Sequence, residues 1–184
     1  VKRGCVVDVA AVDRSVREAL EQAERMAGVE VQHAWVGFGA ASLTSRIVTH
    51  EDPFNRGQIE PDDVDELLTR ARGHVLRDDR AILHAQPTLY TLDGNPGIKD
   101  PVGLFADRFG VSIHLVEADR GPVSNLVTAV RAAHVDIREV VATMIAAGLS
   151  SLTEEQRDLG TALVDIGASL TNIGLFAGGM LFGV

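Results

Sequence analysis

The residues best suited to chemistry lie near the end of the chain, around an aspartate that follows a run of apolar residues. Asp165 stands near the end of a predicted strand, 161–166, and the small residues Gly167, Ala168 and Ser169 come directly after that strand. Small residues let backbone N–H groups approach an anion closely. A carboxylate beside such a turn can hold the water shell of Mg²⁺ next to a phosphate group. The pattern therefore predicts a phosphate-binding hairpin, and a plain hairpin whose turn is satisfied by Asp165 is the alternative.

The other reactive side chains do not form a second candidate site. The six histidines show none of the paired spacings that are typical of a metal site. Cys5 is the one cysteine, which excludes an internal disulfide and favours a reducing compartment. The segment 37–42 begins like a dinucleotide loop, but it lacks the third glycine and the helix that should follow. We therefore expect the chemistry of this chain to reside in the hairpin.

Composition and charge exclude several classes of protein. The net charge is −9 and the isoelectric point is about 5.0, whereas a nucleic-acid-binding protein needs a basic patch. The sequence contains no apolar run of the length of a signal peptide or a membrane span. Aromatic residues make up only 4%, so the core must consist mainly of Val, Leu, Ile and Ala. These features predict a cytoplasmic globular protein that does not bind nucleic acid.

Helical and strand patterns alternate along most of the chain, which indicates an α/β fold. Asp8 can cap a helix that ends at Gly28, and Thr153 and Gln156 form a capping box. We expect strands at 29–38, 43–50, 81–92, 111–117, 137–142 and 161–166, the last one buried on both faces. Further helices are expected from Pro61, from Pro122 and over 144–152.

The composition changes near Ser42, and residues 42–118 read as a separate strand–helix–strand–strand unit with a loop rich in Gly and Pro over 93–103. The segments on either side, 1–41 and 119–184, keep the α/β pattern. We therefore predict an α/β layer interrupted by an inserted subdomain. The sequence stops inside a predicted strand at Val184, so we expect the chain to be a piece of a longer protein.

Several motifs follow one another in the order found in one known family. They are Ala23–Gly28, Ile82-Leu83-His84, Leu92-Asp93-Gly94, Asp100-Pro101-Val102-Gly103-Leu104, Ile113–Val116, Asn125-Leu126-Val127 and the run 152–160. Over essentially all 184 residues the chain resembles FtsA, the bacterial cell-division relative of actin. Its hairpin resembles the second phosphate loop of the actin-like ATPases, Asp-x-Gly-Gly-Gly-Thr-x-Asp.

The resemblance implies a partial actin-like, ribonuclease-H-like fold. Residues 1–41 and 119–184 would be two parts of subdomain 1A, and residues 42–118 would be the inserted SHS2 subdomain, also called 1C. The first phosphate loop of the family precedes residue 1. The FtsZ-binding subdomain and the membrane-targeting helix follow residue 184.

The family also implies a nucleotide site for ATP and Mg²⁺ in the full-length protein. The implied phosphate-binding residues are Asp165, Gly167, Ala168, Ser169, Leu170, Thr171 and Asn172, with Asp165 holding the metal through water. Ala168 and Ser169 replace two glycines, Leu170 replaces a common Thr, and Asn172 replaces an acidic residue. An amide cannot act as a carboxylate base. We therefore expect at most weak ATP hydrolysis by the full-length protein, and neither activity nor tight nucleotide binding by this piece.

The resemblance further implies a role in cell division and septum formation. Such a protein anchors FtsZ filaments to the inner face of the cytoplasmic membrane and recruits later divisome proteins. Residues 42–118 would serve in self-association and partner binding. The predicted contact residues are Leu92, Asp93, Gly94, Gly97, Ile98, Asp100 and Pro101. Two alternatives stay open: a pilus-assembly relative of actin, and a phosphotransferase of the same superfold.

Overall fold

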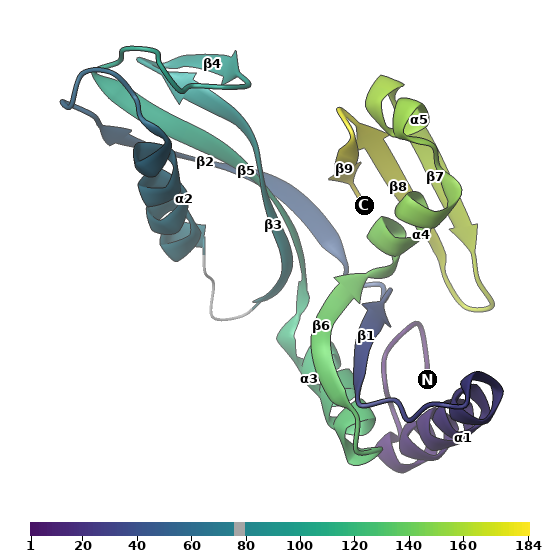
Figure 1. Ribbon diagram of the computed structural model, residues 1–184. Coiled ribbons are helices and arrows are strands. Elements are labelled where there is room, and N and C mark those ends of the chain that lie inside the picture. The colour runs from purple at the N-terminus through teal and green to yellow at the C-terminus, as the bar shows by residue number, and fades with distance from the viewer. Residues whose placement is uncertain (76–79) are drawn as a thin grey trace. The chain divides into compact units, whose positions relative to one another are not determined.

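The computed structural model describes residues 1–75 and 80–184, and residues 76–79 of the predicted insert lie outside this description. The chain divides into two compact units (Figure 1). We call residues 1–44, 79–83 and 117–184 the first unit, and residues 45–78 and 84–116 the insert unit. Each unit has its own buried core.

The first unit contains a small parallel sheet with helices packed against it. Its elements are α1 (Val9–Ala27), β1 (His33–Phe38), α3 (Arg120–Ala132) and β6 (Asp136–Ala142). The helix α1 packs on α3, and Arg17 of α1 donates a hydrogen bond to the carbonyl oxygen of Ala132. The predicted caps of α1 are confirmed: the Asp8 carboxylate accepts from the Ala11 amide, and Gly28 ends the helix with φ of 70°.

The strand β1 begins at His33, four residues later than predicted. The reason lies in Glu24, whose carboxylate accepts a hydrogen bond of 2.8 Å from the Val31 amide. That bond fixes the chain as it leaves α1, so residues 29–31 form a connection before the Gln32 carbonyl oxygen accepts a hydrogen bond from the Asp136 amide of β6.

A second, antiparallel sheet forms the other part of the first unit. Its strands are β7 (Thr161–Ile166), β8 (Thr171–Ala177) and β9 (Met180–Gly183), and the helices α4 (Thr143–Ser151) and α5 (Glu154–Leu159) pack against it. Phe176 and Leu181 are buried beneath these helices, beside Met144. The predicted capping box of Thr153 and Gln156 is present.

The prediction that β7 is buried on both faces is wrong. Val164 is 51% exposed and Ile166 is 80% exposed. The strand lies at the edge of an antiparallel sheet, and along the neighbouring β8 the burial alternates, so only one face is covered by helices.

The insert unit is built from one helix and a four-stranded sheet. It contains α2 (Pro61–Val75), β4 (Asn95–Ile98) and most of β2 (Thr44–Pro53), β3 (Arg80–Leu92) and β5 (Arg108–Asp119), in the sheet order β2-β5-β3-β4. Thr44 and residues 80–83 and 117–119 of these strands belong to the first unit. The central strand β5 buries Phe109, Val111, Ile113 and Leu115 almost completely. Leu67 of α2 is fully buried as well, so this unit has a core of its own.

The short strand β4 lies within the segment that was predicted to be a loop. It pairs with β3 through a two-residue turn, in which Asp93 has φ of 50° and Gly94 has φ of 77°. Positive φ at both positions fits an Asp-Gly hairpin turn, which matches the twist of the flanking strands. The insert therefore has a fourth strand in addition to the three that were predicted.

Candidate functional site

The predicted phosphate hairpin forms between β7 and β8. Asp165 pairs with Asn172, and Ile166 pairs with Thr171, so the turn consists of residues 167–170. The Gly167 amide donates a hydrogen bond of 2.9 Å to the carbonyl oxygen of Leu170. This amide closes the turn, so it is already engaged and does not face a phosphate group as a free donor.

Ala168 and Ser169, which stand where the family has two glycines, do not strain the turn. Neither Ala168 nor Ser169 has a positive φ, so their Cβ atoms are compatible with the backbone at these positions.

Asp165 and Asn172 line a cavity of about 320 Å³ within the first unit. The same cavity is lined by Gly37 and Gly39 at the end of β1 and by Thr143, the first residue of α4. A helix start carries partial positive charge from its unsatisfied N–H groups, which favours anions. Asp165 is exposed, and its carboxylate can hold water around a cation at this cavity.

The two glycines of the segment 37–42 have a packing role. A Cβ atom at Gly39 would lie 2.4 Å from the Thr143 hydroxyl oxygen, and one at Gly37 would lie 3.1 Å from the Thr143 methyl carbon. Glycine at both positions lets β1 and the start of α4 approach closely, which brings Thr143 to the cavity wall.

The other predicted ligands lie elsewhere. Leu170 and Thr171 line a second cavity of about 280 Å³ with Met144, and Asn172 borders both cavities. Gly167, Ala168 and Ser169 are exposed and line neither of the two. The structure thus brings Asp165 and Asn172 together, whereas the residues at the tip of the turn do not line the cavity that these two share.

Among the described residues, no group of three or more His, Cys, Asp or Glu side chains could hold a metal ion by itself. In the part of the chain that the structure describes, no helix is both long and apolar enough to cross a membrane.

The predicted contact residues of the insert serve different purposes. Leu92 and Pro101 are buried and belong to the packing of the unit. One oxygen of Asp93 accepts hydrogen bonds of 2.8 Å from the amides of Asp107 and Arg108, so this residue holds the loop in place. The remaining predicted residues are exposed or half-buried, namely Gly94, Gly97, Ile98 and Asp100.

Burial and ion pairing shift the pKa of Tyr90, Arg108 and Arg56 in the insert. Burial raises the pKa of Tyr90, and the carboxylates of Asp100 and Asp65 raise it further. The Glu51 carboxylate accepts hydrogen bonds from Arg108 and raises the pKa of that guanidinium. Arg56 behaves in the same way: hydrogen bonds to the carboxylates of two α2 residues raise its pKa.

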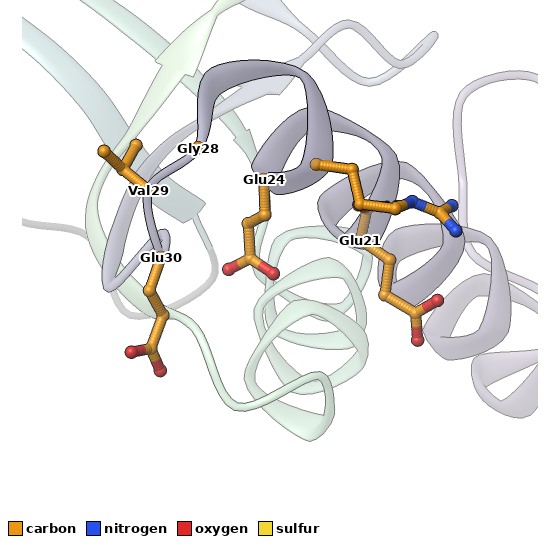
Figure 2. Close-up of a pocket in the computed structure, with 6 residues that line it drawn as sticks. Glu21, Glu24, Gly28, Val29 and Glu30 are labelled. Atoms are coloured by element: carbon orange, nitrogen blue, oxygen red, sulfur yellow. Dashed lines mark hydrogen bonds between the residues drawn. The ribbon is translucent and has the colours of Figure 1, made fainter.

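A further hollow of about 430 Å³ lies where the chain leaves α1 (Figure 2). It is lined by Glu21, Glu24 and Glu30, together with Arg25, Gly28 and Val29. Glu24 is the residue that accepts from the Val31 amide, so the hollow follows from the way the helix ends.

Comparison with known proteins identifies relatives of the whole chain. A family model described as the SHS2 domain inserted in FtsA matches residues 40–117. The cell division protein FtsA of Rhizobium meliloti (strain 1021) is 39% identical over 98% of this chain, and the chain spans 41% of that protein. FtsA of Escherichia coli (strain K12) is 29% identical over 97% of the chain, which spans 43% of it.

A solved structure of a PilM–PilN type IV pilus biogenesis complex shares the fold, with a TM-score of 0.62 and 16% sequence identity. The match covers 99% of this chain and 49% of the chain in that complex. The predicted fold class, an actin-like α/β protein with an SHS2 insert, is confirmed by these matches. The chain spans about two-fifths of the length of the curated relatives described above.

Proposed function

Because this chain is a homologue of part of the FtsA cell-division proteins, we propose that the complete protein acts in bacterial cell division. The observation that carries the proposal is the 39% identity that extends over 98% of the chain. The sequence identity to the chain of the pilus complex is much lower, at 16%, and that match concerns the fold alone. A division role is therefore better supported than a role in pilus assembly.

More specifically, we propose that the complete protein links FtsZ filaments to the inner face of the cytoplasmic membrane and recruits later divisome proteins. Binding to FtsZ and to the membrane is assigned to segments outside this chain. The insert unit takes part in self-association and partner binding, because it is a separate compact unit with exposed loops on a rigid sheet. Together these roles place the protein at the division site.

The nucleotide of the complete protein is ATP with Mg²⁺, bound at the cavity shared by Asp165 and Asn172. The start of α4 supports this assignment, since it offers a partly positive helix end at the same cavity. Hydrolysis is weak or absent because Asn172 has no carboxylate to act as a base. The hydrogen bond from Gly167 to Leu170 also leaves one amide fewer for the phosphates.

The division role is tested by depleting the full-length protein in its own cells. We expect cells that grow into filaments without septa, and division should return when the full-length gene is restored. A fluorescent fusion should gather at the division site. Cells that divide normally after depletion, with defective pili instead, would favour the pilus alternative.

The nucleotide site is tested in the full-length protein with Asp165→Asn, which keeps the shape of the side chain but removes its charge. We expect the affinity for Mg²⁺-ATP to fall by about tenfold or more, corresponding to at least about 1.4 kcal/mol. Asp158→Asn is the matched control, because Asp158 is an exposed carboxylate of α5 and does not line the cavity. Equal affinities of wild type and Asp165→Asn would exclude the proposed role of this carboxylate.

A further inference from the structure

The insert unit contains a hollow of about 510 Å³, and Asp93, one of the predicted contact residues, lines it. It lies between the segment that follows β2 and the loop that leads into β5. Its walls include Phe54, Asn55, Gly57, Asp93, Phe105 and Asp107. All of these residues belong to the insert unit, so the hollow is separate from the two cavities at the hairpin.

The walls of this hollow are held in place by hydrogen bonds. The Phe54 amide donates to the carbonyl oxygen of Asp107 over 2.7 Å, and the Ile59 amide donates to that of Leu104 over 2.8 Å. Asp93 accepts from the amides of Asp107 and Arg108, which ties the loop to the β3–β4 turn. A surface fixed in this way loses little conformational freedom when it binds a partner.

An aromatic ring stands exposed on this rigid loop. Phe105 is 72% exposed, whereas Phe54 at the other side of the hollow is buried and packs edge-on against Phe109. Val102 and Leu104, in the same loop, are also exposed. An exposed aromatic ring beside a hollow is a common anchor of protein interfaces.

The charged side chains that line the hollow, Asp93 and Asp107, are both acidic. The nearby cations are already engaged: Arg56 pairs with carboxylates of α2, and Arg108 pairs with Glu51 at 2.9 Å. The Asp107 carboxylate makes no hydrogen bond or ion pair with any residue that the structure describes. It is therefore available to a cation from outside the chain.

We propose that this hollow binds an arginine side chain carried by a segment of a partner protein. The guanidinium group donates hydrogen bonds to the Asp107 carboxylate while its planar face stacks on the exposed Phe105 ring. Arginine fits better than lysine, because only a guanidinium group combines a planar stacking face with two parallel donors. The proposal rests on the proposed role of the insert unit as a contact module, and it adds the site and the chemistry of the partner.

The test uses the chain labelled with ¹⁵N and three capped tripeptides, Ala-Arg-Ala, Ala-citrulline-Ala and Ala-Lys-Ala. Citrulline keeps the shape of arginine but has no charge. We expect saturable shifts of the Gly57, Ala106 and Asp107 amides with the arginine peptide, and binding that is weaker by about fivefold or more with the citrulline peptide. Equal binding of the arginine and citrulline peptides, or no saturable shift with arginine, would overturn the proposal.

Two variants locate the contacts. Asp107→Asn should abolish the preference for arginine over citrulline, and Phe105→Ala should weaken arginine binding and remove its advantage over lysine. Asp62→Asn is the matched control, because it removes an exposed carboxylate of α2 away from the hollow. Arginine binding that survives Asp107→Asn unchanged would show that the site lies elsewhere.

The failure of this proposal can be told apart from the failure of the proposed function. In cells, the full-length Asp107→Asn variant should restore division less well than the full-length Asp62→Asn variant. If depletion of the protein blocks division but the chain binds no arginine peptide, the arginine site is overturned and the division role stands. If depletion leaves division unaffected, the division role itself is overturned.

Discussion

Tyr90 is the single tyrosine of the chain, so its ionisation can be followed without interference from other residues. Burial raises its pKa, and the carboxylates of Asp100 and Asp65 raise it further. We expect an ultraviolet titration of the folded chain to show a midpoint above that of free tyrosine, which lies at about 10. Asp100→Asn should lower this midpoint, because it removes one of the two negative charges. A midpoint that does not respond to Asp100→Asn would contradict the placement of this loop.

The same shift has a consequence for stability. The pKa of Tyr90 is higher in the folded state than in the unfolded state, so the folded form keeps its proton to a higher pH. Its contribution to stability is complete below about pH 10 and is lost as the pH rises through the folded pKa. Tyr90→Phe should therefore remove part of the decline in stability at alkaline pH, as measured by denaturant unfolding at several pH values.

Two helical glycines should respond in opposite ways to the same substitution. A Cβ atom at Gly148 of α4 would lie 2.1 Å from the ring of the buried Phe176, whereas one at Gly73 of α2 meets nothing within 4 Å. We expect Gly148→Ala to lower the free energy of unfolding by about 1–2 kcal/mol, since overpacking outweighs the gain in helix propensity. Gly73→Ala should raise it by about 0.5–1 kcal/mol.

Calorimetry of both variants measures these effects under identical conditions. Stabilisation by Gly148→Ala would mean that the Phe176 ring moves aside at little cost. Destabilisation by Gly73→Ala would contradict the open surroundings of that position.

The helix caps, which depend on single residues, were predicted well from the sequence. The caps at Asp8 and Gly28 and the capping box at Thr153 are present because each depends on contacts within a few residues. The Asp93-Gly94 turn was missed, although the pair is a known hairpin signal and could have revealed β4. The Gly167–Leu170 hydrogen bond could not be predicted, because it depends on the exact length of the turn.

At the scale of elements, Arg80 joins the strands β2, β3 and β5 where they meet. Its guanidinium group lies 2.5 Å from the Asp119 carboxylate and donates to the Thr44 hydroxyl over 2.6 Å and the Ser42 carbonyl over 3.0 Å. The Arg80 side chain is only 17% exposed, and its Nε lies 3.6 Å from the buried Glu117 carboxylate. This single side chain therefore connects the ends of three strands.

We expect Arg80→Met to lower the free energy of unfolding by about 2–3 kcal/mol, because it removes the cation from beside the Glu117 carboxylate. Adding Glu117→Gln to this variant should recover part of the loss, which a double-mutant cycle measures. Arg72→Met is the control, since Arg72 is exposed on α2 and should change stability by less than about 0.5 kcal/mol. Equal effects of the two arginine variants would contradict a structural role for Arg80.

Element types were predictable from periodicity, but their burial was not. The apolar run of β7 predicted a strand, and a strand is present. Whether both of its faces are covered depends on which helices pack there, and the residues of a strand do not encode that information by themselves. The prediction that β1 begins at residue 29 was wrong for a related reason, because the Glu24 carboxylate accepts a hydrogen bond from the Val31 amide.

At the scale of the whole molecule, the hypothesis of a role in cell division came from the family resemblance. Composition, periodicity and motif spacing alone did not predict it. The matches to FtsA proteins and to their SHS2 domain confirm that resemblance. The assignment of residues 1–41 and 119–184 to one subdomain stays a prediction. In the described residues β1 of the first segment pairs with β6 of the second, whereas β7, β8 and β9 form a separate sheet within the second segment.

The insert is expected to fold without the rest of the chain, and Tyr90 offers the means to test this. Its core residues Leu67, Phe109 and Ile113 are buried within the unit itself. Asp65 and Asp100, which raise the pKa of Tyr90, also belong to the insert. We therefore expect an excised segment 40–120, which retains Arg80 and Asp119, to unfold cooperatively on heating and to titrate its tyrosine at the same elevated pH as the complete chain. A tyrosine that titrates as in a free peptide, or a melt without a cooperative transition, would show that the insert needs the first unit in order to fold.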